Sequence, residues 1–270
     1  MDERDNREAD RVEEQTTPRT PIIYEIVRRN GNDEMERPAV SLWWSGIAAG
    51  LSLSFSLLAQ ALLRERLPDA PWRELVAALG YPIGFLMVVL ARQQLFTENT
   101  ITVVLPVMAE PTRRNFGRAA RLWAIVLAAN LAGTFASALF CSFTPVLPEG
   151  TREHMLAISS ASMHYGPLEM GLRAVTAGYL MAALVWMMPA AGNMQFHVVA
   201  AMTYVIGAGG FAHIVAGSAE AFLLLFAGRL GVGELLSGFA LPALAGNIVG
   251  GTALFAMISY AQVMKEMEGS

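Results

Sequence analysis

The chemically most informative residues of this chain are polar and ionisable side chains inside long apolar segments. Thr97 and Glu98 follow Leu95 and Phe96 in the stretch QLFTENTITVVLP, and His213 follows a glycine-rich stretch at residues 207–210. Ionisable groups at membrane depth usually serve a pathway, because an unpaired charge in hydrocarbon is costly. An imidazole can exchange a proton and a hydrogen bond with a small solute. These residue types predict passage of a solute or proton.

The composition is typical of a protein that crosses the membrane several times. Of 270 residues, 54% are hydrophobic and 16% are charged, and the mean hydropathy is +0.42. The sequence has no nucleophile–base spacing, metal-ligand cluster or phosphate-binding glycine loop, and its one cysteine, Cys141, excludes an internal disulfide. We expect neither an enzyme nor a metal or cofactor site, and no nucleic-acid partner.

Charge-poor runs predict six transmembrane spans, because a bilayer core of about 30 Å needs about 20 apolar residues in a helix. The runs are residues 38–63, 75–108, 122–143, 168–189, 196–226 and 235–264. The second and fifth are too long and too polar for one simple helix, so we expect both to be broken. Irregular backbone at that depth must be buried in protein or line a wet cavity.

The flanking segments predict how the chain is oriented in a bacterial inner membrane. Arginines concentrate between the second and third spans, which places the N-terminus and C-terminus in the cytoplasm. We expect three parts: a cytoplasmic segment at 1–37, a transmembrane domain at 38–264 and a cytoplasmic tail at 265–270. Residues 1 to about 20 are too polar to fold alone. Residues 21–29 predict a short amphipathic helix, lying on the membrane or on a neighbouring subunit.

Two landmarks recur in the two halves of the chain. Asn130 and Gly133 in the third span match Asn247 and Gly250 in the sixth at an offset of 117 residues, and Phe96 and Phe211 lie 115 residues apart. Three spans followed by three spans indicate repeats of opposite orientation. The glycines and their asparagines favour close helix packing.

These residues resemble the formate/nitrite transporter family. The resemblance rests on Leu-Phe-Thr at 95–97, Phe-x-His at 211–213 and Asn-x-x-Gly in the third and sixth spans, and it covers roughly residues 38 to 264. The acidic N-terminal extension further resembles the YfdC-like branch. The family implies a homopentamer of six-span, aquaporin-like protomers in a lipid bilayer. Each protomer would pass a small monovalent anion, formate-like or nitrite-like, often with a proton.

The resemblance also implies positions along a pathway. Its central histidine maps onto His213 and its loop threonine onto Thr97. Constrictions map onto Leu95 and, less cleanly, onto other apolar residues. The expected pathway residues are His213, Thr97, Leu95, Phe96, Phe85, Tyr81, Ile206, Glu98 and Phe211.

One departure from the family concerns the outer vestibule, where relatives carry a lysine. The only lysine here is Lys265, near the C-terminus, and His164 or Arg173 are candidate replacements. The missing lysine keeps open an alternative function, an aquaporin-like pore for water or a small neutral solute, although the chain has no Asn-Pro-Ala tripeptide.

Three residues have two interpretations each. His213 either exchanges protons or is a histidine satisfied between helices. Glu98 either faces the pathway or occupies the first helical turn after a Thr97 cap, where a carboxylate opposes the helix dipole. Glu220, on the same helical face as His213 about two turns on, favours a packing or interprotomer hydrogen bond over transport.

Overall fold

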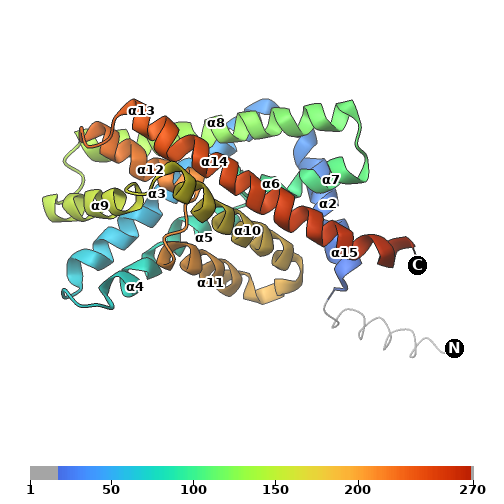
Figure 1. The fold of residues 1–270 in the computed structure, drawn as a ribbon, viewed down its shortest axis with the longest axis horizontal. Coiled ribbons are helices and arrows are strands. Elements are labelled where there is room, and N and C mark those ends of the chain that lie inside the picture. The colour runs from blue at the N-terminus through green and yellow to red at the C-terminus, as the bar shows by residue number, and fades with distance from the viewer. Residues whose placement is uncertain (1–17, 269–270) are drawn as a thin grey trace.

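The computed structural model describes residues 18–268, with side chains described as far as residue 264 (Figure 1). Within this range the chain is helical, with turns between helices and no β-strand. This agrees with the all-α class. The expected disorder at 1–20 falls mostly outside the described residues, and the side chains of the expected 265–270 tail fall wholly outside them.

The described part of the first half of the chain contains eight α-helices and one 3-10 helix, η1. They are α2 (Thr20–Glu36), α3 (Ala39–Arg66), α4 (Arg73–Ala77), η1 (Ala78–Gly80), α5 (Pro82–Leu90), α6 (Asn99–Thr102), α7 (Val104–Ala109), α8 (Arg113–Phe143) and α9 (Glu149–Ser162). The run from α4 to α5 is nearly continuous, whereas residues 91–98 between α5 and α6 form no helix.

The second half begins with α10 (Pro167–Ala191), η2 (Gly192–Met194), α11 (Gln195–Ala208) and α12 (Ile214–Phe226). It ends with α13 (Val232–Glu234), η3 (Leu235–Ala240), α14 (Leu241–Ile248), η4 (Val249–Ala256) and α15 (Met257–Glu268), where η3 and η4 are π-helical. Residues 209–213 between α11 and α12 form no helix.

Five helical stretches among the described residues are long and apolar enough to cross a membrane. They are Ala39–Arg66, Arg73–Leu90, Arg113–Phe143, Pro167–Ala208 and Val232–Met264, and two shorter apolar helices are Asn99–Ala109 and Ile214–Phe226. The count differs from the expected six because residues 167–208, which include the predicted fourth span and the start of the fifth, count as one stretch of helix. Apolar composition alone does not mark the turn at Gly192, where φ is +47°.

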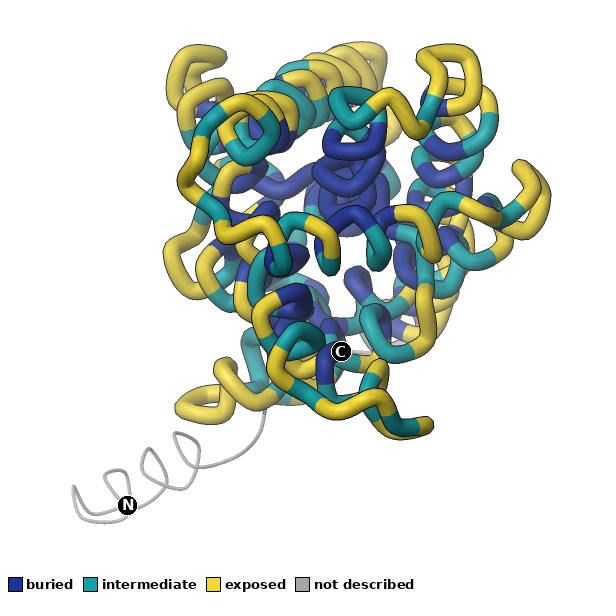
Figure 2. Tube along the Cα trace, turned by 90° about the vertical axis from the view of Figure 1, so that its left-hand side faces the viewer, coloured by how far each residue is buried: buried dark blue, intermediate teal, exposed yellow. Residues whose placement is uncertain are grey.

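The outside of the bundle is rich in apolar side chains. Viewed from one end, buried segments gather towards the middle and exposed segments form the outer surface (Figure 2). Large exposed residues there include Trp44, Phe143, Leu168 and Leu241. A surface this apolar suits lipid or another subunit rather than water.

Helix α2 is longer than the predicted amphipathic helix and packs within its own chain. Pro21, in the first helical turn, provides a preset φ and needs no hydrogen-bond donor. Tyr24, Val27 and Met35 are buried, and Gly31 lies so close to the Thr102 carbonyl that no larger residue would fit. This face of α2 therefore packs on its own protomer.

The outer face of α2 carries a compact ion-pair group. Arg28 and Arg29 both donate to the Glu25 carboxylate, at 2.7 Å for each Nε. These hydrogen bonds, that of Arg28 above all, lower the pKa of Glu25 to about 2. Arg37 similarly pairs with Glu34 at 2.9 Å near the end of the helix.

Helix α9 was not expected from the sequence. It lies between α8 and α10 and buries Thr151, Met155, Leu156 and Ser159 on one face. Helix α9 contains many polar residues, so it forms no long apolar run in the sequence. Cys141 on α8 packs against the same apolar cluster as α9 and is a half-buried free thiol.

Candidate transport pathway

His213 and Thr97 form a hydrogen-bonded pair at the point where two interrupted helical regions meet. The Thr97 hydroxyl oxygen lies 2.7 Å from Nε2 of His213. The two side chains are 0% and 1% exposed, respectively. Both residues were expected from the sequence to lie on a pathway, and the structure brings them together from positions 116 residues apart in the chain.

The position of His213 before α12 defines which ring nitrogen carries hydrogen. Nδ1 accepts a hydrogen bond from the Ala216 amide at 3.2 Å, as a cap of the helix start. A neutral imidazole with Nδ1 as acceptor carries its hydrogen on Nε2, which then donates to Thr97. The Thr97 hydroxyl keeps its own hydrogen for another acceptor. The pair can therefore present a hydroxyl donor to a small solute.

Asn130 holds the chain segment that carries Thr97. Its Oδ1 accepts from the Phe96 amide at 2.9 Å, and its Nδ2 donates to the carbonyls of Gln94 at 2.8 Å and Gly46 at 2.9 Å. Buried backbone groups outside a helix need such partners. One side chain thus satisfies the break between α5 and α6 and ties it to α3.

Asn247 does the same for the segment that carries His213. Its Oδ1 accepts from the Ile214 amide at 2.8 Å, and its Nδ2 donates to the carbonyls of Ala212 at 3.0 Å and Ala174 at 2.8 Å. The expected packing role of the asparagines is thus a specific hydrogen-bonding role at the two breaks.

The two breaks also begin alike. Where α5 ends, Arg92 has φ of +52° and the Gln93 amide donates to the Val88 carbonyl at 2.9 Å. Where α11 ends, Gly210 has φ of +60° and the Phe211 amide donates to the Ile206 carbonyl at 3.0 Å. This is a common way for a helix to end, with one residue in the left-handed region.

These contacts change the expected match between the halves. Equivalent atoms pair Arg92 with Gly210 and Phe96 with Ile214, both 118 residues apart. Phe211 therefore corresponds to Gln93. The prediction from the sequence, which paired Phe211 with Phe96, is wrong. Backbone conformation and hydrogen bonds align the two halves more reliably than the shared residue type of two phenylalanines.

Glycines allow the asparagine-bearing helices to lie against their neighbours. A side chain at Gly50 would collide with the Asn130 carbonyl, and one at Gly178 with the Asn247 carbonyl. Gly133 and Gly250 meet the backbone of α3 and α10 in the same way. Close packing of small residues is thus what these predicted packing glycines provide.

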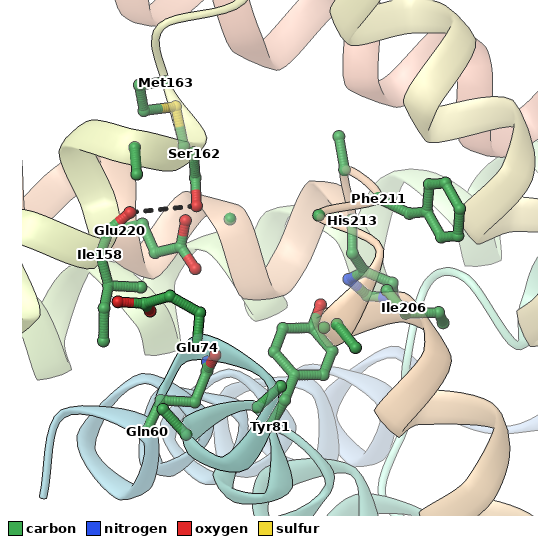
Figure 3. Close-up of a pocket in the computed structure, with 18 of the residues that line it drawn as sticks. Gln60, Glu74, Tyr81, Ile158, Ser162, Met163, Ile206, Phe211, His213 and Glu220 are labelled. Carbon is green, nitrogen blue, oxygen red and sulfur yellow. Dashed lines mark hydrogen bonds between the residues drawn. The ribbon is translucent and has the colours of Figure 1, made fainter. Parts of the chain in front are cut away.

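A cavity of about 410 Å³ opens on one side of the pair, and we call it the His213 cavity. His213, Tyr81, Ile206 and Phe211 line it, as expected of pathway residues, and so does Glu220. Figure 3 shows His213, Tyr81 and Glu220 around this space, from three different parts of the chain. Arg64 also lines it and bonds to Glu74 at 2.8 Å.

A second cavity, of about 500 Å³, lies beside α2, and we call it the α2 cavity. Glu98, Arg92, Gln94 and Asn99 line it together with Glu34 of α2. Gln94 donates to Glu34 at 2.7 Å and accepts from Asn99 at 3.1 Å. The cavity therefore has a connected polar wall.

Glu98 is only partly explained by its place at a helix start. It is the residue before α6, but its side chain makes no capping hydrogen bond. Thr97, expected to cap this helix, instead bonds to His213, so that expectation is corrected. The Oε1 atom of Glu98 is buried and has no hydrogen-bond partner among the described residues. The carboxylate thus borders the α2 cavity with one oxygen unsatisfied.

An apolar layer surrounds the pair. The Phe85 ring stands edge-on to the His213 ring, with centroids 5.1 Å apart, and Tyr81 lies against Phe85 at 5.2 Å. Leu95 and Phe96 are buried and line neither cavity, and Phe96 faces Trp123 of α8 at 5.7 Å.

The candidate replacements for the vestibule lysine lie near the His213 cavity but do not line it. Arg173 sits 3.7 Å above the Tyr165 ring, pairs with Glu169 and donates to the carbonyls of Gly209 and Gly210 at 3.4 Å. His164 is exposed on a separate surface depression. Arg64, the cation that lines this cavity, was not expected from the sequence, because it follows the first span as an ordinary flanking charge.

A helical bundle with an apolar exterior and two helix interruptions that meet at a buried polar pair is typical of a membrane channel or transporter. The family model described as formate/nitrite transporter matches residues 21–261. The chain is 45% identical over 255 residues to the inner membrane protein YfdC of Escherichia coli K12, covering 94% of this chain and 82% of that protein. The chain therefore belongs to the formate/nitrite transporter family.

Solved structures share this fold. A pentameric formate channel with formate bound superposes with a TM-score of 0.71 at 19% identity, covering 83% of this chain and 97% of that one. An ion channel of the same family superposes with a TM-score of 0.76 at 19% identity, covering 89% and 96%. The resemblance to the family and to its YfdC-like branch is confirmed, and the family is one of membrane transport proteins.

Proposed function

We propose that this protein moves a small monovalent anion of the formate type, or its protonated neutral acid, across the bacterial inner membrane. The observation that carries the proposal is the 2.7 Å hydrogen bond between Thr97 and His213. His213 borders one cavity, and Glu98, next to Thr97, borders the other. A solute that passes between the cavities meets this pair. Support for the solute class comes from the family and from the formate bound to a structural neighbour.

The proposed chemistry follows from the cost of dehydrating an ion. A small anion that leaves water for the apolar layer around Phe85 and Leu95 loses most of its solvation. The Thr97 hydroxyl donates a hydrogen bond to the anion and passes its hydrogen on as it takes the Nε2 hydrogen of His213. A proton from the solution in the His213 cavity enters at Nδ1 in the same step, so the imidazole stays neutral. The solute then crosses as a neutral acid and returns the proton on the other side.

The architecture we propose has six spans in two inverted repeats of three, with an aquaporin-like arrangement. The second span is α5 followed by α6 and α7, and the fifth is α11 followed by α12. Support comes from Asn130 and Asn247, which make the same three hydrogen bonds to matching backbone positions. Repeats of opposite orientation bring such breaks together near the membrane centre.

The proposed assembly is a homopentamer in the lipid bilayer, with a pathway in each protomer. One solved structure of this fold is described as pentameric. We propose the N-terminus and C-terminus in the cytoplasm, with residues 1–37, 38–264 and 265–270 as cytoplasmic segment, channel domain and tail. The α2 cavity then faces the cytoplasm and the His213 cavity faces the periplasm.

A neutral-solute pore is the second candidate, and two carboxylates favour it. Glu98 and Glu220 border the cavities, and each would repel an anion when ionised. A solute panel on purified protein in liposomes separates the candidates. We expect formate or nitrite uptake above that of empty liposomes, with water and glycerol permeation unchanged. Accelerated water or glycerol permeation without anion uptake would contradict the proposal.

A further inference from the structure

Glu220 is a buried carboxylate inside the His213 cavity that the proposed chemistry does not use. It lies on α12 seven residues after His213 and is 6% exposed. Figure 3 shows its side chain on the wall of the cavity that Tyr81 and His213 also border. The expectation of a packing or interprotomer hydrogen bond does not account for a carboxylate facing this space.

No cation within the described residues lies at ion-pair distance from the Glu220 carboxylate. All ion pairs found among these residues involve other acidic side chains. Arg64, the cation of the cavity, is already engaged, because its Nε bonds to Glu74 at 2.8 Å and its Nη1 lies 3.1 Å from His154. The Ser162 hydroxyl on α9 lies beside Glu220 and donates to the Ile158 carbonyl at 3.2 Å.

Among the residues whose side chains the structure describes, the other elements packed against α12 supply no further charge to the cavity. On the α8 side, α12 is joined through neutral hydroxyls, Ser218 and Thr134, at 2.8 Å. The η3 side contributes Phe239. The titratable and charged groups that border the cavity with Glu220 are Arg64, Glu74, Tyr81, Tyr165 and His213.

A carboxyl group in such a place has opposite effects on an anion in its two protonation states. When ionised, it repels a second negative charge across a space with little water, where attraction and repulsion are both strong. When protonated, it is neutral and its O–H can donate a hydrogen bond to the anion. The proton on this group therefore decides which charge the cavity accepts.

We propose that Glu220 is a proton-binding specificity residue of the His213 cavity, which admits small monovalent anions when the carboxyl is protonated and excludes them when it is ionised. This inference rests on the proposed function, because it assumes that anions cross this cavity. It assigns to Glu220 a role separate from proton delivery at His213. Acid on the side of the His213 cavity would then open the path as well as supply the transported proton.

The test compares Glu220→Gln with the unmodified protein in liposomes, with labelled formate as the probe. Glutamine keeps the shape and stays neutral. At about pH 8 we expect formate influx through Glu220→Gln to rise roughly tenfold, the effect of one like charge removed from a poorly hydrated space. At about pH 5 the two proteins should agree within about twofold. The two proteins are compared at the same pH, because the fraction of formate present as neutral formic acid is then the same for both.

Glu153→Gln is the matched control, because it removes one carboxylate from the exposed face of α9. It should leave formate influx unchanged at both pH values. Equal influx through Glu220→Gln and the unmodified protein at the alkaline pH would overturn the proposal.

Infrared titration without any anion gives a readout that does not depend on transport. We expect a protonated carboxyl band that disappears as the pH rises, is absent in Glu220→Gln and persists in Glu153→Gln. Absence of that band would overturn the proposed proton site even if formate flux is normal. If the band is present but the unmodified protein passes neither formate nor nitrite, the proposed function fails while the proton site stands. Should Glu220→Gln not assemble, Glu220→Asp must shift the band, and an unchanged band would refute the assignment.

Discussion

Replacing Asn130 by alanine should destabilise the protein more than any single lost hydrogen bond could. The amide side chain bonds to the Phe96 amide and to the carbonyls of Gln94 and Gly46, all buried. Hydrogen bonds between membrane helices average about 0.6 kcal/mol each, which gives about 2 kcal/mol for three. A buried backbone group left without a partner costs about 1–3 kcal/mol, so three give up to about 9 kcal/mol. We expect about 3–5 kcal/mol, because some water will enter.

The assay is thermal unfolding of the detergent-solubilised protein, followed by tryptophan fluorescence. Asn247→Ala should lower the transition temperature about as much as Asn130→Ala, since it removes the same three contacts from the other break. Thr134→Ala is the control, because it removes one bond between helices, the 2.8 Å contact with Ser218, and should cost about 0.6 kcal/mol. A shift for Asn130→Ala no larger than that of Thr134→Ala would refute this reasoning.

Three other substitutions have defined outcomes. Glu98→Gln should increase formate flux at neutral pH by removing an unsatisfied carboxylate from the α2 cavity, and unchanged flux in liposomes would assign Glu98 to the helix start. Gly178→Ala should lower the stability by about 1–3 kcal/mol, because its methyl group collides with the Asn247 backbone, whereas Gly238→Ala meets nothing within 4 Å and should be tolerated in the same melting assay. The lowered pKa of Glu25, about 2 against the usual 4.5, means that its ion pairs stabilise α2 above about pH 4.5 and lose that effect as the pH falls towards 2. The protection factors of the α2 amides, which are corrected for the intrinsic exchange rate at each pH, should therefore fall on acidification. Those of Glu25→Gln at neutral pH should match those of the unmodified protein in acid, and protection factors that do not change with pH in the unmodified protein would contradict this.

The sequence predicts the membrane class and the residues of the central pair because these leave strong local signals. Long apolar runs indicate membrane helices, and a histidine after several glycines indicates a break with a polar group. The bond between Thr97 and His213 is the meeting of two such breaks. The asparagine motifs also pointed to equivalent places in the two halves, although their hydrogen bonds emerge only from the fold.

Other features leave no local signal. Helix α9 is amphipathic and short of apolar residues, so a search for spans passes over it. The docking of α2 depends on the fit of Gly31 against Thr102, which no periodicity reveals. Arg64 and Glu220 look like a flanking charge and a stray acid until tertiary packing places both on one cavity. Phe96 and Phe211 were matched by residue type, whereas the backbone hydrogen bonds pair Phe96 with Ile214, three residues after Phe211.

Formate flux through Thr97→Ala and His213→Asn is the measurement that tests the central claim most directly. Each of these two variants is compared with the unmodified protein and with a control, His197→Asn. The control changes an exposed histidine that lines neither cavity. Loss of one hydrogen-bonding group from a buried pathway is worth about 1.4 kcal/mol or more, so flux should fall roughly tenfold in each pathway variant and stay unchanged in the control. If liposomes containing either pathway variant take up formate as fast as the unmodified protein at every pH, the pair does not lie on the route of the anion.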